Sequence, residues 1–149
     1  TMRLTGELPV TGWREWATLP ALGLVRIAAK IDTGARSCAL HVEWQRERVE
    51  NGIAQVAFAL RESPEAPLRE LCAPIAGRRT VADTGGGRES RIFIRSRLRL
   101  GDWEHEVDIG LANRHGLRHR LLIGRAALAG HWCVDPGRTF LLGDGEASA

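Results

Sequence analysis

The sequence predicts an all-β fold with one short helix. Three observations support this: several segments alternate apolar and polar residues with a period of two, short turn signals separate them, and only one run suits a helix. The chain has 149 residues, of which 44% are hydrophobic, as expected for about one domain. We expect an N-terminal extension over 1–12, the domain over 13–143 and a disordered tail over 144–149.

The first half of the chain contains a strand, a hairpin and a further short strand. Residues 24–31 (LVRIAAKI) alternate like a half-buried strand, which runs directly into Asp32. Asn51-Gly52 predicts a hairpin within 49–60, because both positions of a type I′ turn need positive φ. After a proline-containing loop, a short strand is expected near Leu71.

The second half begins with three glycines, Gly85–Gly87, which indicate a mobile turn because they form regular structure only at a cost. Residues 91–100 (RIFIRSRLRL) show the clearest alternation in the chain, with arginines mostly on one face. Gly101-Asp102 is expected to turn this strand back into a strand over 103–111.

The C-terminal part is expected to contain the helix and the last strands. An apolar triplet and a glycine within 118–130 (RHRLLIGRAALAG) lead into a helix of about two turns that ends before Gly130. Two strands, 131–135 and 139–142, are expected on either side of a Pro136-Gly137 turn.

Composition argues against several functions. The net charge is +3 and the basic residues, all arginine except Lys30, are dispersed, so nucleic acid is only weakly indicated. Three cysteines without a CxxC pair argue against a disulfide framework, so we expect a reducing, cytoplasmic location. No apolar run approaches the ~18 residues of a membrane span and the start lacks signal-peptide features, so no membrane partner is expected.

No metal site or cofactor is predicted. His115 and His119 have the i, i+4 spacing of a zinc-binding helix, but Gly116 lies between them and no HExxH motif occurs. The chain also lacks a P-loop for nucleotide phosphates.

The stretch AKIDTGARSCAL (29–40) places an aspartate, a hydroxyl and a glycine at the end of a strand. Gly34 lets the backbone bend close to the Asp32 carboxylate, its amide can donate to that carboxylate, and Thr33 supplies a bracing hydroxyl. Two such carboxylates about 3 Å apart share one proton, so one acts as general base on water and the other as general acid.

The second carboxylate is expected from a second copy of the chain. The Asp-Thr-Gly at 32–34 stands at the end of an apolar strand, whereas the same tripeptide at 83–85 begins the glycine-rich stretch. A homodimer whose two-fold axis passes between the two Asp32 side chains brings each residue near its own copy. The sequence therefore predicts a catalytic pair across a homodimer interface.

These motifs resemble those of retropepsin-type aspartic peptidases, in which DTGA (32–35), a glycine-rich stretch and LLIGRAAL (121–128) occur in this order. Together with GWREWATLPALGL and CVDPGRTFLLG, they are similar to a bacterial group of retropepsin-like proteins over roughly 12–143. That group is often labelled ATP-dependent zinc proteases, and its genes are associated with an ATP-grasp ligase that adds glutamate to ribosomal protein tails.

The resemblance implies a closed acid-protease β-barrel, a two-fold homodimer and a flap over the cleft at 84–88. It implies catalytic roles for Asp32, Thr33 and Gly34. The residues that it implies for substrate binding are Ala35, Arg36, Thr84, Gly85, Gly86, Gly87, Arg88 and Arg91, and those for support of the catalytic turn are Leu122, Ile123, Gly124 and Arg125.

The chain also departs from the viral members of this family. Arg36 stands where they carry an aspartate that pairs with the arginine of the Gly-Arg segment, so Arg125 needs another partner. Residues 41–80 form an insertion whose placement is open, and Cys38 is expected to be a small buried side chain rather than a reactive thiol.

We expect an aspartic endopeptidase that hydrolyses peptide or amide bonds. Acidic peptides such as glutamate-rich tails are the favoured substrates, because Arg36, Arg88 and Arg91 are expected near the cleft. The alternative is a catalytically inactive, dimeric peptide-binding module of the same fold. A basic nucleic-acid-binding barrel that uses the arginines of 95–99 is less favoured, because aromatic residues make up only 5% of the chain.

Overall fold

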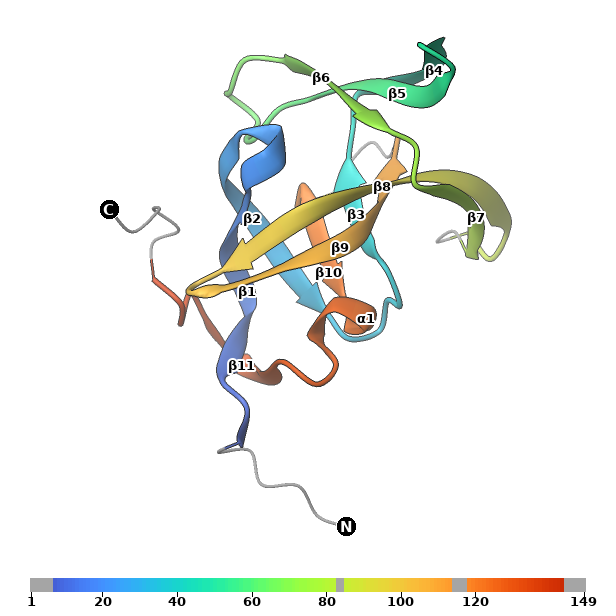
Figure 1. Ribbon diagram of the computed structural model, residues 1–149. Coiled ribbons are helices and arrows are strands. Elements are labelled where there is room, and N and C mark those ends of the chain that lie inside the picture. The colour runs from blue at the N-terminus through green and yellow to red at the C-terminus, as the bar shows by residue number, and fades with distance from the viewer. Residues whose placement is uncertain (1–6, 83–84, 114–117, 144–149) are drawn as a thin grey trace.

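The computed structural model describes residues 7–82, 85–113 and 118–143 (Figure 1). Strands make up nearly all of its regular structure, which confirms the predicted all-β class. The strands are β1 (Val10–Leu19), β2 (Leu24–Asp32), β3 (Cys38–His41), β4 (Trp44–Glu50), β5 (Ile53–Leu60), β6 (Arg69–Pro74), β7 (Gly77–Ala82), β8 (Arg88–Leu100), β9 (Trp103–Ala112), β10 (Leu121–Gly124) and β11 (Cys133–Thr139).

Six of these strands close into a barrel, as the resemblance implied. Neighbouring strands pair in the order β1, β2, β10, β3, β9 and β8, and Thr18 of β1 pairs with Arg99 of β8 to complete the ring. The same sheet continues beyond the ring with β11 beside β1 and β7 beside β8. Closure leaves the six strands without a free edge, so the barrel is a stable frame for the loops at its ends.

The barrel interior is filled by apolar side chains that alternate along the strands. On β8, the predicted inward residues Ile94, Leu98 and Leu100 are almost fully buried, whereas Ile92 is half-buried. The other strands contribute the remaining large side chains of the core, among them Leu19, Leu24, Ile27, Leu40, Ile109 and Ile123.

Most of the predicted insertion at 41–80 forms a second sheet of three strands, in the order β4, β5, β6 (Figure 1), whereas 77–80 belong to β7 of the barrel sheet and His41 ends β3. Asn51 and Gly52 have φ angles of 52° and 77°, so the predicted positive-φ turn joins β4 to β5. Phe58 and Leu60 of β5 are fully buried in the same hydrophobic cluster as the barrel strands. The insertion is therefore packed onto the barrel rather than separate from it.

Two predictions for the C-terminal part are wrong. Helix α1 (Arg125–Leu128) has one turn instead of two, because Ala129 is already extended and Gly130 has a φ of 81°. Pro136-Gly137 does not separate two strands but lies within β11, where the pairing with β1 shifts in register. Because β11 is an edge strand, a proline without an N–H interrupts no ladder on its outer side.

Short helical segments are the only helices among the described residues. A 3-10 turn, η2 (Pro20–Leu22), lies between β1 and β2, and α1 follows β10 directly. Within the described part of the chain, no helix is long and apolar enough to cross a membrane. The expected extension over 1–12 includes the start of β1 at Val10, while the tail over 144–149 lies outside the described residues.

Candidate active site

The candidate active site lies at the turn that follows β2. The amide of Gly34 donates to Oδ1 of Asp32 at 3.0 Å, and the amide of Ala35 donates to the Asp32 carbonyl at 3.2 Å. Asp32 is half-buried, whereas Thr33 and Gly34 are exposed. The turn thus fixes one oxygen of the Asp32 carboxylate with a backbone donor, while Thr33 and Gly34 remain exposed to solvent.

Strand β10 supports this turn from below. It runs parallel to β2, so that Gly124 lies beside Asp32. The amide of Arg125 then donates to the carbonyl of Ala35 at 2.9 Å, and that of Ala126 to Arg36 at 3.0 Å. A β-carbon on Gly124 would lie 2.5 Å from the carbonyl oxygen of Ser37, so only glycine fits here.

Backbone carbonyls take the place of the missing acidic partner of Arg125. Its guanidinium donates to the carbonyls of Thr33 at 3.5 Å and Gly34 at 3.3 Å. Arg125 therefore holds the turn itself, and Arg36 beside it stays exposed.

A cleft of about 730 Å³ opens at Asp32. It brings together three of the residues implied for substrate binding, Ala35, Arg36 and Arg91, with Gly34 and Arg125 of the turn and its support. Five further lining residues were not predicted from the sequence: Ser37, Arg79, Thr80, Val81 and Ala82.

The glycine-rich stretch connects β7 to β8 as a hairpin, in which Ala82 pairs with Arg88. Gly86 has a φ of 85° in this turn. Gly85–Gly87 and Arg88 do not line the cleft. Residues 79–82 of β7, the first strand of this hairpin, do line it. Thr84 lies outside the described residues. The position of 79–82 directly before the predicted glycine-rich turn was the signal that could have identified these residues.

Cys38 lies below the turn and is 3% exposed. Burial raises the pKa of its thiol to about 11, because the thiolate would lose its hydration. The thiol is therefore protonated at neutral pH, which excludes it as a nucleophile and agrees with the expected structural role.

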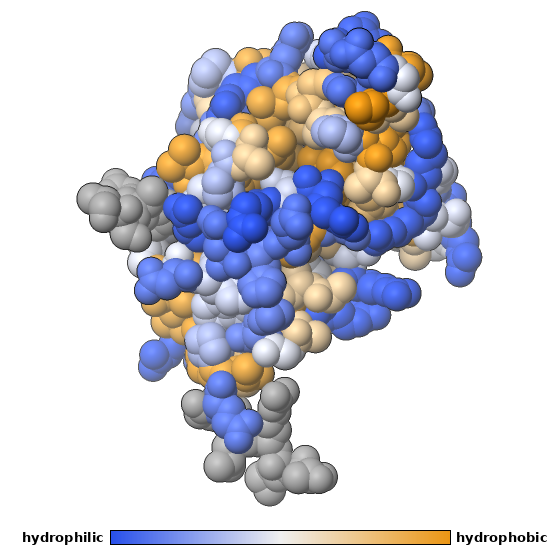
Figure 2. Space-filling view, in the orientation of Figure 1, coloured by the Kyte–Doolittle hydropathy of each residue, from blue (hydrophilic) through white to orange (hydrophobic). Residues whose placement is uncertain are grey.

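The arginines of 95–99 do not form a free cationic row. Arg95 pairs with Asp108 at 3.1 Å, and both Arg97 and Arg99 pair with Glu104. Figure 2 shows hydrophilic residues over β8 and β9, where these cross-strand pairs lie. Neutralised arginines offer little attraction to phosphates, which weighs against the nucleic-acid reading.

No group of three potential metal ligands occurs among the described residues, and His119, one of the two histidines at i, i+4 spacing, is buried beside Trp13. His115 lies outside the described residues. Burial, with Arg14, Lys30 and Arg118 nearby, lowers the pKa of His119.

A closed six-stranded barrel with an Asp-Thr-Gly turn at the end of β2 and a Gly-Arg segment packed beneath it defines the retropepsin-like class. The chain belongs to the RimB-like family, described as "Retropepsin-like aspartic endopeptidase RimB", whose model matches residues 10–144.

Similar curated proteins carry a different name. Probable alpha-L-glutamate ligases of Shewanella pealeana and Parasynechococcus marenigrum are 32% and 34% identical to the chain, each over 91% of its length. The chain spans only about 30% of the length of these relatives. Among solved structures, protein Lpg0085 of Legionella pneumophila, described as of unknown function, matches with a TM-score of 0.77 and 27% identity, over 90% of this chain and 98% of that one.

Proposed function

We propose that this protein is an aspartic peptidase in which two chains each supply one Asp32. The observation that carries the proposal is the Asp32 turn, held by the Gly34 amide and by β10 in a chain of the retropepsin-like class. One carboxylate takes a proton from water, and the oxygen of that water bonds to the amide carbon. The other carboxyl group protonates the carbonyl oxygen to give a gem-diol. As the C–N bond breaks, the first carboxyl gives the proton it took from water to the leaving nitrogen, and the second regains its proton from a hydroxyl of the gem-diol.

The exposure of the turn supports a homodimer. In one chain, Thr33 and Gly34 face open solvent and no second carboxylate is among the residues that line the cleft. A second copy across a two-fold axis would cover the exposed turn and supply the missing acid. We further propose a cytoplasmic location, consistent with three free cysteines.

The charge of the cleft supports acidic peptide substrates. Arg36, Arg91 and Arg125 line it beside Asp32, and Arg36 and Arg125 have no ion-pair partner among the described residues. The guanidiniums of Arg36 and Arg125 could pair with substrate carboxylates, whereas Arg91 is already paired with Glu89. Neither a nucleic acid nor a membrane is proposed as a partner.

The ligase name of the relatives does not lead to a ligase proposal. The part of those relatives that matches covers 91% of this chain, and the family model describes nearly the same residues, 10–144, as retropepsin-like. The remaining 70% or so of each relative has no counterpart in the sequence given.

The test is hydrolysis of acidic and neutral peptides by wild type and by Asp32→Asn. Wild type should cleave the acidic peptide faster and bind a statine-type isostere. Asp32→Asn should lose at least about 10³-fold in kcat with unchanged thermal unfolding. Asp83→Asn is the matched control, because Asp83 begins the other Asp-Thr-Gly, and it should keep activity.

Other outcomes are equally informative. If wild type binds peptides without cleaving them, the inactive binding module is correct. If Asp83→Asn also abolishes cleavage, the second acid comes from the same chain and the dimeric mechanism is wrong. Equal rates on acidic and neutral peptides would remove the preference for acidic substrates.

A further inference from the structure

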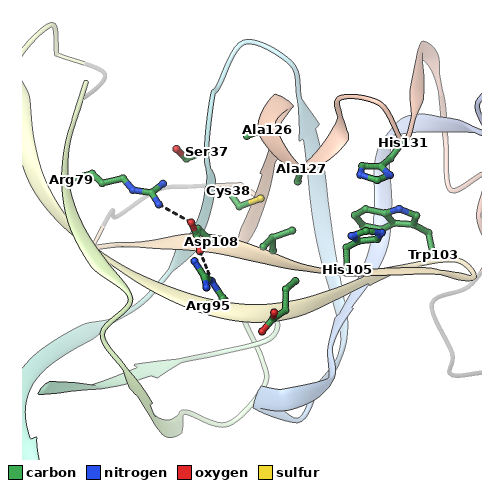
Figure 3. Close-up of a pocket in the computed structure, with 12 residues that line it drawn as sticks. Ser37, Cys38, Arg79, Arg95, Trp103, His105, Asp108, Ala126, Ala127 and His131 are labelled. Atoms are coloured by element: carbon green, nitrogen blue, oxygen red, sulfur yellow. Dashed lines mark hydrogen bonds and ion pairs between the residues drawn. The ribbon is translucent and has the colours of Figure 1, made fainter. Parts of the chain in front are cut away.

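A second pocket of about 430 Å³ adjoins the cleft at Asp32 (Figure 3). Both cavities are lined by Ser37 and Arg79, so the cleft continues into this pocket past these two residues. The floor is made by small side chains that include Ala126 and Ala127 of α1. None of the roles assigned above uses the pocket.

Strand register gives the spacing between the two cavities. Gly124 of β10 lies beside Asp32, and Ser37 lies against Gly124. Strands β3 and β9 pair in parallel with Cys38 beside Ile109, and Ser37 and Asp108 directly precede these two residues. Three strand spacings of ~4.8 Å therefore put Asp108, at the near end of the pocket, roughly 14 Å from Asp32, and an extended peptide covers this distance in about four residues.

One wall of the pocket is a cluster of rings. His105 stacks on Trp103 with centroids 5.0 Å apart, and His131 lies 4.6 Å from His105 and 5.3 Å from Trp103. Trp132 packs edge-on against Trp103 behind them. In Figure 3, His105, Trp103 and His131 gather at one end of the pocket, away from Arg79. Such a wall offers ring faces and edges to another ring.

The opposite wall is charged but internally neutralised. Asp108 bridges Arg79 at 2.7 Å and Arg95 at 3.1 Å, as the dashed lines in Figure 3 show. Burial alone would raise the pKa of Asp108, but the hydrogen bonds from both arginines outweigh it and its pKa lies below the usual value. Glu106 balances the remaining charge. Unlike the cleft at Arg36 and Arg125, this pocket has no excess of cationic groups for a carboxylate.

We infer that this pocket is a distal specificity subsite that accepts an uncharged aromatic side chain of the substrate, four or more residues from the scissile bond. The ring of the substrate would pack between the Trp103–His105–His131 cluster and the alanines of α1. This inference rests on the proposed peptidase function, and it adds that the peptide is not uniformly acidic: carboxylates lie near the scissile bond and a ring lies further along.

The test uses ten-residue peptides with an acidic centre and a single Phe at successive flanking positions, compared with the all-Ala flank. For wild type, kcat/KM should rise about tenfold when Phe lies four or more residues from the scissile bond. Ala126→Leu fills the floor of the pocket and should reduce this preference to less than about twofold, with kcat/KM for the Ala peptide unchanged. Ala129→Leu, the same change at an exposed residue outside the pocket, should keep the preference.

Binding measured without catalysis separates the two proposals. Fluorescence anisotropy with the Asp32→Asn variant should show the same Phe preference, and adding His105→Ala should weaken it. If no peptide is cleaved but this preference appears, the subsite stands and the peptidase proposal fails. If peptides are cleaved and no position favours Phe, or Ala126→Leu keeps the preference, the subsite is wrong while the peptidase proposal stands.

Discussion

At the scale of single residues, Gly124 sets the distance between the candidate catalytic turn and its support. A methyl group there would meet the backbone carbonyl of Ser37 at 2.5 Å, and backbone cannot move aside as a flexible side chain can. We expect Gly124→Ala to lower the free energy of unfolding by about 3 kcal/mol, measured by urea denaturation.

Gly77 provides the control for this prediction. It lies in β7 with open space where a β-carbon would be, and its φ is not positive. Gly77→Ala should change the unfolding free energy by less than about 0.5 kcal/mol. Equal effects of the two substitutions would contradict the claim that close packing at 124 requires glycine.

At the scale of elements, Glu15 joins β1 to the segment that follows β11. Its fully buried carboxylate accepts hydrogen bonds from the amides of Gly12 at 2.7 Å, Leu141 at 3.0 Å and Leu142 at 3.2 Å. Glu15→Gln replaces one acceptor oxygen with a donor, so at least one buried amide loses its partner. We expect a loss of about 2 kcal/mol of unfolding free energy and faster hydrogen exchange at 141 and 142.

The exposed Glu70 of β6 is the matched position for this substitution. Glu70→Gln should leave both stability and hydrogen exchange at 141 and 142 nearly unchanged. If Glu15→Gln behaved like Glu70→Gln, the carboxylate would not be what attaches this segment to β1.

How much the sequence predicts depends on whether an element is determined locally. Asn51-Gly52 fixes its own turn, and the alternation of 91–100 fixes the faces of β8, so both predictions were confirmed. The prediction that Pro136-Gly137 separates two strands was wrong, because a proline is tolerated within β11 only when that strand lies at the edge of the sheet. The position of β11 at the edge depends on long-range pairing. Arg79 was missed for the same reason: only the folding of β7 against β8 brings it to the cleft.

At the scale of the whole molecule, the proposed mechanism makes activity depend on association. Because each chain supplies one Asp32, the specific activity of wild type should fall on dilution below the dimer dissociation constant. Mixing wild type with an equal amount of Asp32→Asn should reduce activity per wild-type chain by about half, since mixed dimers carry a single acid. Activity that is independent of concentration and of the added variant would contradict a site shared between chains.

The position of β10 has a consequence for how the protein is made. This strand inserts between β2 and β3, although 88 residues lie between Asp32 and Leu121. A nascent chain that has emerged only as far as the three-stranded sheet thus contains Asp32, Thr33 and Gly34 but lacks β10, the strand that supports their turn. Such non-local pairing slows folding and delays it until β10 has been synthesised. The acid turn would therefore be completed only after Gly124 has left the ribosome, so nascent chains that end before this residue would be inert.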